Sequence, residues 1–308
     1  MMRTYGVTPT PLPALTKISG TGRLKGYLHS LTSLEEIGED VDLGGYAYPL
    51  PSLTTIGRNA YLSEYPHPLP ALRYVGWHLE LRGYFHSLPS LTYIGGRADL
   101  CSYYYALPSL TEVGGDADFR EYNFPLPSLK KIDGEAFLTD SECDLSALEA
   151  IGSNAHLKGY RHDLKSLKRI EGYVYLDGYH HSLPSLEYIG GSFDLYNYPQ
   201  PLPSLKEIAE NANLHGYEHM PSWIDCVGKC SRGYSFWADL SRGLVRGGCR
   251  SFSPDEALAH WGPNGPSNRE DCLSLAKKWY LKRLSIVSSL MNSFHIFSDK
   301  NSIFFTRL

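Results

Sequence analysis

The stretch that decides the fold is residues 88–103, Leu-Pro-Ser-Leu-Thr-Tyr-Ile-Gly-Gly-Arg-Ala-Asp-Leu-Cys-Ser-Tyr, because its pattern returns every nineteen residues on both sides. Three apolar columns keep this period without a slip through eleven units, beginning at Leu12, Leu15 and Ile18. A fourth apolar column runs from Leu24 to Leu214. Copies of this number and regularity predict a repeat solenoid in which each unit forms one coil.

The spacing within a unit predicts how each coil is built. An apolar pair two residues apart, such as Ala98 and Leu100, has the period of a strand, whereas the preceding apolar residues are three apart, which suits a polyproline or 3₁₀ turn. Prolines such as Pro89 fit an extended return path, and glycines such as Gly57 mark an expected sharp turn into the strand. A unit this short has no room for a long helix.

We therefore expect a mainly β repeat solenoid with parallel strands and no long convex helices over residues 1–220. Beyond Met220 the period fails, and an exposed last coil needs a cover. Residues 221–308 are expected to form a small α+β cap. In that segment residues 236–252 read as one or two short strands, and Ser253 with Glu256 forms a capping box that opens a helix.

A second helix is expected to open at Ser267 with Glu270, because an apolar face follows at helical spacing.

The repeats resemble a compact leucine-rich repeat of bacterial and phage proteins, whose units read approximately Leu-Pro-x-Leu-x-x-Ile-Gly-Gly-x-Ala-x-Leu-x-Gly-Tyr. The resemblance covers about residues 12–220 and implies a binding scaffold. The chain departs from ordinary leucine-rich repeats by placing tyrosine where they have an inward asparagine. Gly248-Cys249-Arg250 followed by Ala259-His260-Trp261 resembles a short C-terminal module of unknown function in phage and bacterial proteins, which implies provenance more than chemistry.

Composition and charge indicate a folded chain in two parts. Of 308 residues, 42% are apolar and 20% charged, which is too apolar for a disordered chain. Residues 228–308 carry 12 Lys and Arg against 6 Asp and Glu (+6), which leaves 17 against 27 (−10) for residues 1–227. No apolar run is long enough to span a membrane, and the N-terminus lacks a secretory pattern. We expect a cytoplasmic protein of a bacterial or phage-infected cell.

Two aromatic columns keep the same period. Tyrosine recurs from Tyr27 to Tyr217 with Ser141 as the exception, and histidine recurs two positions later, interrupted by residues such as Tyr48. We expect a tyrosine ladder inside the solenoid whose hydroxyls serve the backbone of the turns, rather than a ligand platform. The interrupted histidines disfavour a metal site on their column.

Residues between the inward strand positions should point outward and form the binding surface. Acidic residues prevail in its first coils and aromatic residues in its later ones. The candidate partner-binding residues are Asp99, Asp116, Asp118, Glu135, Phe137, His156, Tyr173, Tyr175 and Tyr196. A solenoid core needs no large rings here, so they are candidate hot spots, although rings also raise strand propensity. The negative charge favours a basic protein partner and makes nucleic acid an unlikely ligand of the solenoid.

The C-terminal segment raises alternative functions in residues 224–308. A zinc site would use its four cysteines, Cys226, Cys230, Cys249 and Cys272. Their spacing lacks a second paired knuckle, so buried reduced thiols are the expected state. A small enzyme would use Cys249 as nucleophile and His260 as base. Nucleic-acid or acidic-membrane binding would use the basic helix residues Lys277, Lys278, Lys282 and Arg283, which otherwise form a solvated face or an ion-pair seam.

The sequence thus predicts a non-catalytic protein-binding scaffold that needs no cofactor and has no catalytic residues. By analogy with the phage resemblance, its partner would be a host protein, a component of a bacterial defence system that the chain inhibits.

Overall fold

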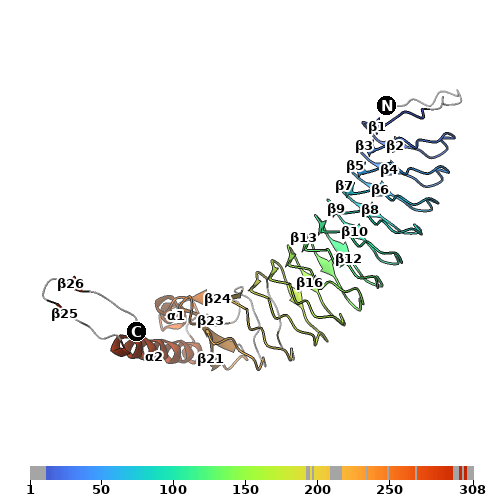
Figure 1. Cartoon of the computed structure of the whole chain (residues 1–308). Coiled ribbons are helices and arrows are strands. Elements are labelled where there is room, and N and C mark those ends of the chain that lie inside the picture. The colour runs from blue at the N-terminus through green and yellow to red at the C-terminus, as the bar shows by residue number, and fades with distance from the viewer. Residues whose placement is uncertain are drawn as a thin grey trace. The chain divides into compact units, whose positions relative to one another are not determined.

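The structure is a computed structural model that describes residues 12–191, 195, 198–208, 217–233, 235–247, 250–267, 269–293, 298–299 and 302–303. The side chains of residue 208 and of residues 282–308 lie outside this description. The chain divides into two compact units, residues 1–219 and 220–308 (Figure 1).

The first unit is a parallel β-solenoid, which confirms the predicted fold class. The coils from β1 to β18 each give a two-residue strand to each of two sheets, and strands of successive coils lie side by side (Figure 1). The first sheet contains β1 (Lys17–Ile18), β3 (Glu36–Ile37), β5 (Thr55–Ile56), β7 (Tyr74–Val75), β9 (Tyr93–Ile94), β11 (Glu112–Val113), β13 (Lys131–Ile132), β15 (Ala150–Ile151), β17 (Arg169–Ile170), β19 (Tyr188–Ile189) and β20 (Glu207–Ile208).

The second sheet contains β2 (Gly22–Arg23), β4 (Val41–Asp42), β6 (Ala60–Tyr61), β8 (Leu79–Glu80), β10 (Ala98–Asp99), β12 (Ala117–Asp118), β14 (Ala136–Phe137), β16 (Ala155–His156) and β18 (Val174–Tyr175). Register advances by one repeat at each pairing, so that Ala98 of β10 lies opposite Ala117 of β12. Because register and repeat coincide, every sequence column becomes a straight row of side chains along the solenoid.

The inward columns form the core. In one coil, Leu50, Leu53, Ile56, Ala60 and Leu62 are all fully buried. Complete burial of a leucine or isoleucine side chain stabilises a fold by about 1.5–3 kcal/mol, and each coil repeats most of this set. The core therefore grows coil by coil, as a stack of units that bury their faces only against neighbours.

The tyrosine ladder is confirmed. The Tyr65 hydroxyl donates to the backbone carbonyl of Tyr48 at 2.9 Å, and its ring stacks on Tyr46 and Tyr84 with centroids 6.4 Å apart. Equivalent bonds to the preceding coil are made by Tyr46, Tyr84, Tyr103, Tyr122, Tyr160, Tyr179, Tyr198 and Tyr217. At the exceptional coil the Ser141 hydroxyl donates to the Tyr122 carbonyl at 3.2 Å.

The histidine column also serves the backbone. The ring Nε2 atoms of His67, His86, His162 and His219 lie 2.8–3.0 Å from carbonyl oxygens of the preceding coil. Each of these rings also contacts the tyrosine two positions earlier in its coil. One nitrogen of each ring is thus occupied by a structural contact.

The glycines after the Ile/Val column lie at the predicted bend before the second-sheet strand, and they have a further role that the sequence did not predict. A Cβ atom at Gly57 would lie 2.1 Å from the Gly38 carbonyl oxygen, and one at Gly76 would lie 2.0 Å from the Gly57 oxygen. Neither glycine has a positive φ angle. These positions need glycine because the backbones of adjacent coils approach closely there.

A second glycine column does require a left-handed backbone. It lies directly before the ladder tyrosines, where Gly45 has φ +74° and Gly83 has φ +73°. Among the described residues, Glu64, Ser102, Glu121 and Asp140 hold the same conformation without being glycine. Those four residues carry a backbone cost of about 1–2 kcal/mol each.

The second unit has the predicted small α+β composition. Strands β21 (Ile224–Lys229), β22 (Ser235–Asp239), β23 (Leu244–Gly247) and β24 (Arg250–Phe252) form an antiparallel sheet in that order. Helices α1 (Pro254–Trp261) and α2 (Glu270–Ser293) follow, and then the pair β25 (Ser298–Asp299) and β26 (Ser302–Ile303). Among the described residues no helix combines the length and apolarity needed to cross a membrane.

The α1 start is as predicted, and the α2 start is not. The Ser253 side chain accepts from the Glu256 backbone and the Glu256 side chain accepts from the Ser253 backbone, which completes the capping box. Helix α2 begins at Glu270, but the Ser267 hydroxyl lies 2.9 Å from His260 Nε2. Ser267 therefore contacts α1 rather than capping α2.

Candidate functional site

Three aromatic rings stack on the outward face of the second sheet. Phe137 of β14, His156 of β16 and Tyr175 of β18 are direct register partners. Their ring centroids are 4.7 Å and 4.6 Å apart, and their planes differ by 13° and 12°. This distance matches the separation of adjacent strands, so the register alone sets the stacking. We call Phe137, His156 and Tyr175 the aromatic stack.

Tyr173 extends the aromatic stack along the same face. Its ring lies 6.5 Å from the Tyr175 ring at an angle of 37°. Tyr173 is 47% and Tyr175 48% exposed, whereas Phe137 and His156 are half-buried. The patch formed by the four residues is therefore open to a partner mainly at its two tyrosines.

Charged groups surround the aromatic stack. The Arg120 guanidinium lies 5.9 Å from the centre of the Phe137 ring. His156 Nε2 lies 3.4 Å from Glu135 Oε2, within ion-pair distance but not aligned as a hydrogen bond. Lys158 and Asp177 form an exposed ion pair at 3.5 Å. Exposed pairs of this kind contribute little stability and can exchange partners readily.

Asp118 does not offer the exposed carboxylate that the sequence suggests. It is 1% exposed and accepts hydrogen bonds from Arg120 Nε at 2.9 Å and Nη2 at 2.6 Å. Burial alone would raise its pKa, but the Arg120 bonds hold the pKa of Asp118 below its usual value. Arg97 approaches the same carboxylate at 3.6 Å. The charge of Asp118 is therefore compensated inside the solenoid, by Arg120 of its own coil and by Arg97 of the preceding coil.

Asp116 and Glu135 belong to a polar ladder that the sequence analysis missed. Asp116 Oδ1 accepts from the Glu135 backbone at 2.8 Å, and Glu135 Oε1 accepts from Asn154 Nδ2 at 2.7 Å. Asn154 Oδ1 in turn accepts from the Tyr173 backbone at 2.8 Å. The signal was the recurrence of short acceptor side chains just before each second-sheet strand, as at Asp40 and Asn59.

Asp99 is half-exposed and accepts from the Cys101 backbone at 3.2 Å, two residues along its own coil. Asp42 and Asp118 make the same local bond, to Gly44 and Arg120. The aspartates of this column therefore serve their own coils. Tyr196, the last predicted partner residue, lies outside the described residues.

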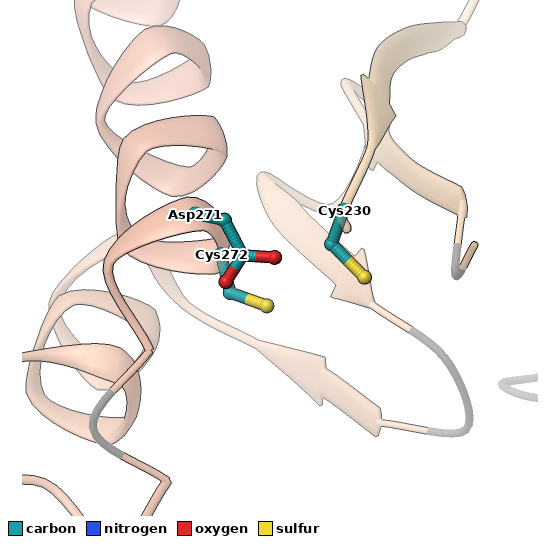
Figure 2. A group of neighbouring side chains, drawn as sticks. All are labelled: Cys230, Asp271 and Cys272. Carbon is teal, nitrogen blue, oxygen red and sulfur yellow. The ribbon is translucent and has the colours of Figure 1, made fainter. Parts of the chain in front are cut away.

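A second cluster lies wholly in the second unit. Cys230 follows β21, and Asp271 and Cys272 stand in the first turn of α2. Their ligand atoms all lie within 4.8 Å of one another, and Figure 2 shows Asp271 and Cys272 extending from the helix toward Cys230. We call these residues the thiol–carboxylate cluster. Of the four predicted zinc cysteines it contains two, since Cys226 is exposed and Cys249 lies outside the described residues.

The structure describes some of the residues of the other two sites predicted in this unit, the Cys249–His260 pair and the basic helix. His260 Nε2 lies 2.9 Å from Ser267 Oγ and 3.4 Å from Arg250 Nη1, and burial followed by the Arg250 charge lowers the pKa of His260. Its proposed nucleophile, Cys249, is not described. On the basic helix, Lys278 Nζ donates to the Val227 carbonyl at 3.3 Å and Lys277 is exposed, while the side chains of Lys282 and Arg283 are not described.

The fold defines a class, a parallel β-solenoid joined to a small α+β unit. Comparison of the chain with protein-family models, curated proteins and solved structures finds no match.

Proposed function

We propose that the chain is a non-catalytic protein-binding scaffold that holds its partner on the outward face of the second sheet, at the aromatic stack and Tyr173. In β4, β10 and β12 the same column holds an aspartate bonded to its own backbone, whereas β14, β16 and β18 hold rings stacked in register. A phenyl ring offers no acceptor to the backbone, so Phe137 cannot make the local bond that Asp42, Asp99 and Asp118 make from the same column.

The chemistry of the patch suits a protein surface with basic and apolar side chains. Tyr173 and Tyr175 are exposed on this face, and exposed aromatic residues are frequent hot spots of protein–protein interfaces. Glu135 lies 3.4 Å from the His156 ring nitrogen, and residues 1–227 carry a formal charge of −10. An arginine or lysine placed over Tyr173 or Tyr175 would gain a cation–π contact.

The resemblance to phage repeats extends this proposal to a biological setting. The partner would be a host protein in the cytoplasm of a phage-infected bacterium, and binding would inhibit a defence system.

The test is a capture experiment from a bacterial lysate, treated with nuclease and washed at high salt. Tyr173→Ala combined with Tyr175→Ala should reduce recovery of the bound protein by at least about tenfold, the effect expected of a hot spot. Tyr61→Ala is the matched control, because Tyr61 occupies the same column in β6 and is 40% exposed. Equal loss with Tyr61→Ala, or full capture by the double variant, would refute the proposal. Loss of all bound protein on nuclease treatment would favour nucleic-acid binding instead.

A further inference from the structure

The thiol–carboxylate cluster brings together groups that are distant in sequence. Cys230 directly follows β21, forty-one residues before Asp271. Ligand atoms of a tetrahedral zinc ion with thiolates are roughly 3.8 Å apart. The cluster has its three ligand atoms within 4.8 Å, so a contraction of about 1 Å by side-chain rotation reaches that geometry.

The Asp271 carboxylate is held in a fixed orientation. The Ser231 backbone donates to Oδ2 at 2.8 Å, the Ser231 hydroxyl donates to it at 2.7 Å, and Arg269 Nη2 donates to it at 3.1 Å. All three of these bonds fall on Oδ2. Outer donors that orient a ligating carboxylate in this way are typical of metal sites.

The charges also balance around a divalent cation. Two thiolates and one carboxylate carry −3, a divalent ion reduces this to −1, and Arg269 lies beside the carboxylate to offset the remainder.

We propose that Cys230, Asp271 and Cys272 form a zinc-binding site that joins the end of β21 to the start of α2. Zinc binding replaces the two thiol protons by two Zn–S bonds and releases both protons to solvent, with no change in oxidation state. The fourth position of the tetrahedron is filled by water. Both cysteines belong to the apolar core with Val227, Ala276 and Trp279, so the ion would stabilise this small unit directly.

The experiment uses the full chain, reduced and stripped of metal with a chelator, and adds Co²⁺ or Zn²⁺ alone. We expect one Co²⁺ per chain with a thiolate-to-metal absorption band that Zn²⁺ displaces, and zinc should raise the melting temperature. Cys230→Ser and Cys272→Ser should abolish the band. Asp271→Asn, which keeps the shape of the side chain, should weaken affinity by at least about tenfold. Circular dichroism of each variant verifies the fold.

Cys226→Ser is the matched control, because Cys226 lies in β21 of the same unit but is exposed and outside the cluster. It should leave the band and the affinity unchanged. Absence of a thiolate band in the folded chain, an equal loss with Cys226→Ser, or unchanged affinity in Asp271→Asn would overturn the proposal. The proposal would also be overturned if protein purified in reducing buffer contained a Cys230–Cys272 disulfide.

Discussion

Tyr65 donates its hydroxyl to the backbone carbonyl of Tyr48, seventeen positions earlier and one coil back, at 2.9 Å. Each coil is thereby bonded to its neighbour through a buried side chain as well as through the backbone. A buried carbonyl without a hydrogen-bond donor is costly. Removing this bond should therefore lower the free energy of unfolding by more than the small net contribution of an ordinary hydrogen bond.

Replacement of Tyr65 by Phe should lower the free energy of unfolding by about 1–3 kcal/mol, since it leaves the Tyr48 carbonyl without its donor. Urea unfolding followed by circular dichroism measures the change. The control is Tyr61→Phe in the same coil, whose exposed hydroxyl should contribute little. Equal stability of Tyr65→Phe and the natural chain would show that the ladder bond is dispensable.

The ladder should also set an alkaline limit of stability. Burial raises the pKa of Tyr46 and Tyr217 to about 12, whereas an unfolded tyrosine ionises near its ordinary value of about 10. Because these pKa values are higher in the folded state, the two tyrosines contribute their full stabilisation below about pH 10. This contribution is lost as the pH rises through about 12.

Ultraviolet absorbance of the phenolate should therefore rise in two steps. Exposed tyrosines should ionise first in the folded chain, and the ladder should ionise later, together with loss of structure. A single step near pH 10 with the circular dichroism unchanged would contradict this prediction.

The close approach of coils predicts a large cost for a single methyl group. Gly57→Ala should destabilise the solenoid by more than about 2 kcal/mol, because its Cβ would meet the Gly38 carbonyl oxygen at 2.1 Å. At Gly45, where no atom lies within 4 Å of an added Cβ, alanine should cost only about 1 kcal/mol of backbone strain. Thermal unfolding of both variants checks the order, and a smaller effect at Gly57 would refute it.

Glycine should be favoured where the chain holds a left-handed backbone without it. Glu64 has φ +60°, so Glu64→Gly should raise the free energy of unfolding by about 0.5–1 kcal/mol, the relief of strain less the added entropy of the unfolded chain. Denaturant titration provides the measurement. A decrease would mean that the Glu64 side chain makes contacts worth more than the strain.

The sequence predicted the solenoid and the tyrosine ladder because both follow from the nineteen-residue period. Successive coils pair in register, so residues one period apart form a row along the solenoid. The sequence did not predict that Arg120 covers Asp118, or that Asp116 and Glu135 bond to the next coil. Those contacts depend on side-chain length and rotamer, and the rotamer cannot be read from the amino-acid sequence. The partner role of the predicted face stays a prediction.

The cysteines show the same limit. The sequence offered four cysteines as zinc ligands, but the fold determines which residues are neighbours in space. In the structure Asp271 lies beside Cys230 and Cys272, whereas Cys226 is exposed. The prediction of Ser267 as a helix cap failed for a similar reason, since its hydroxyl found His260 nearby.

Coils that bond only to the coil before and the coil after are interchangeable modules. Removing or duplicating nineteen residues anywhere in the regular part rejoins matching ends, so the molecule can change length in steps of one strand separation. The rings on its second sheet would then move as a rigid group, nearer to or farther from the start of the chain. Evolution can thus adjust the reach of this protein without redesigning the surface it presents.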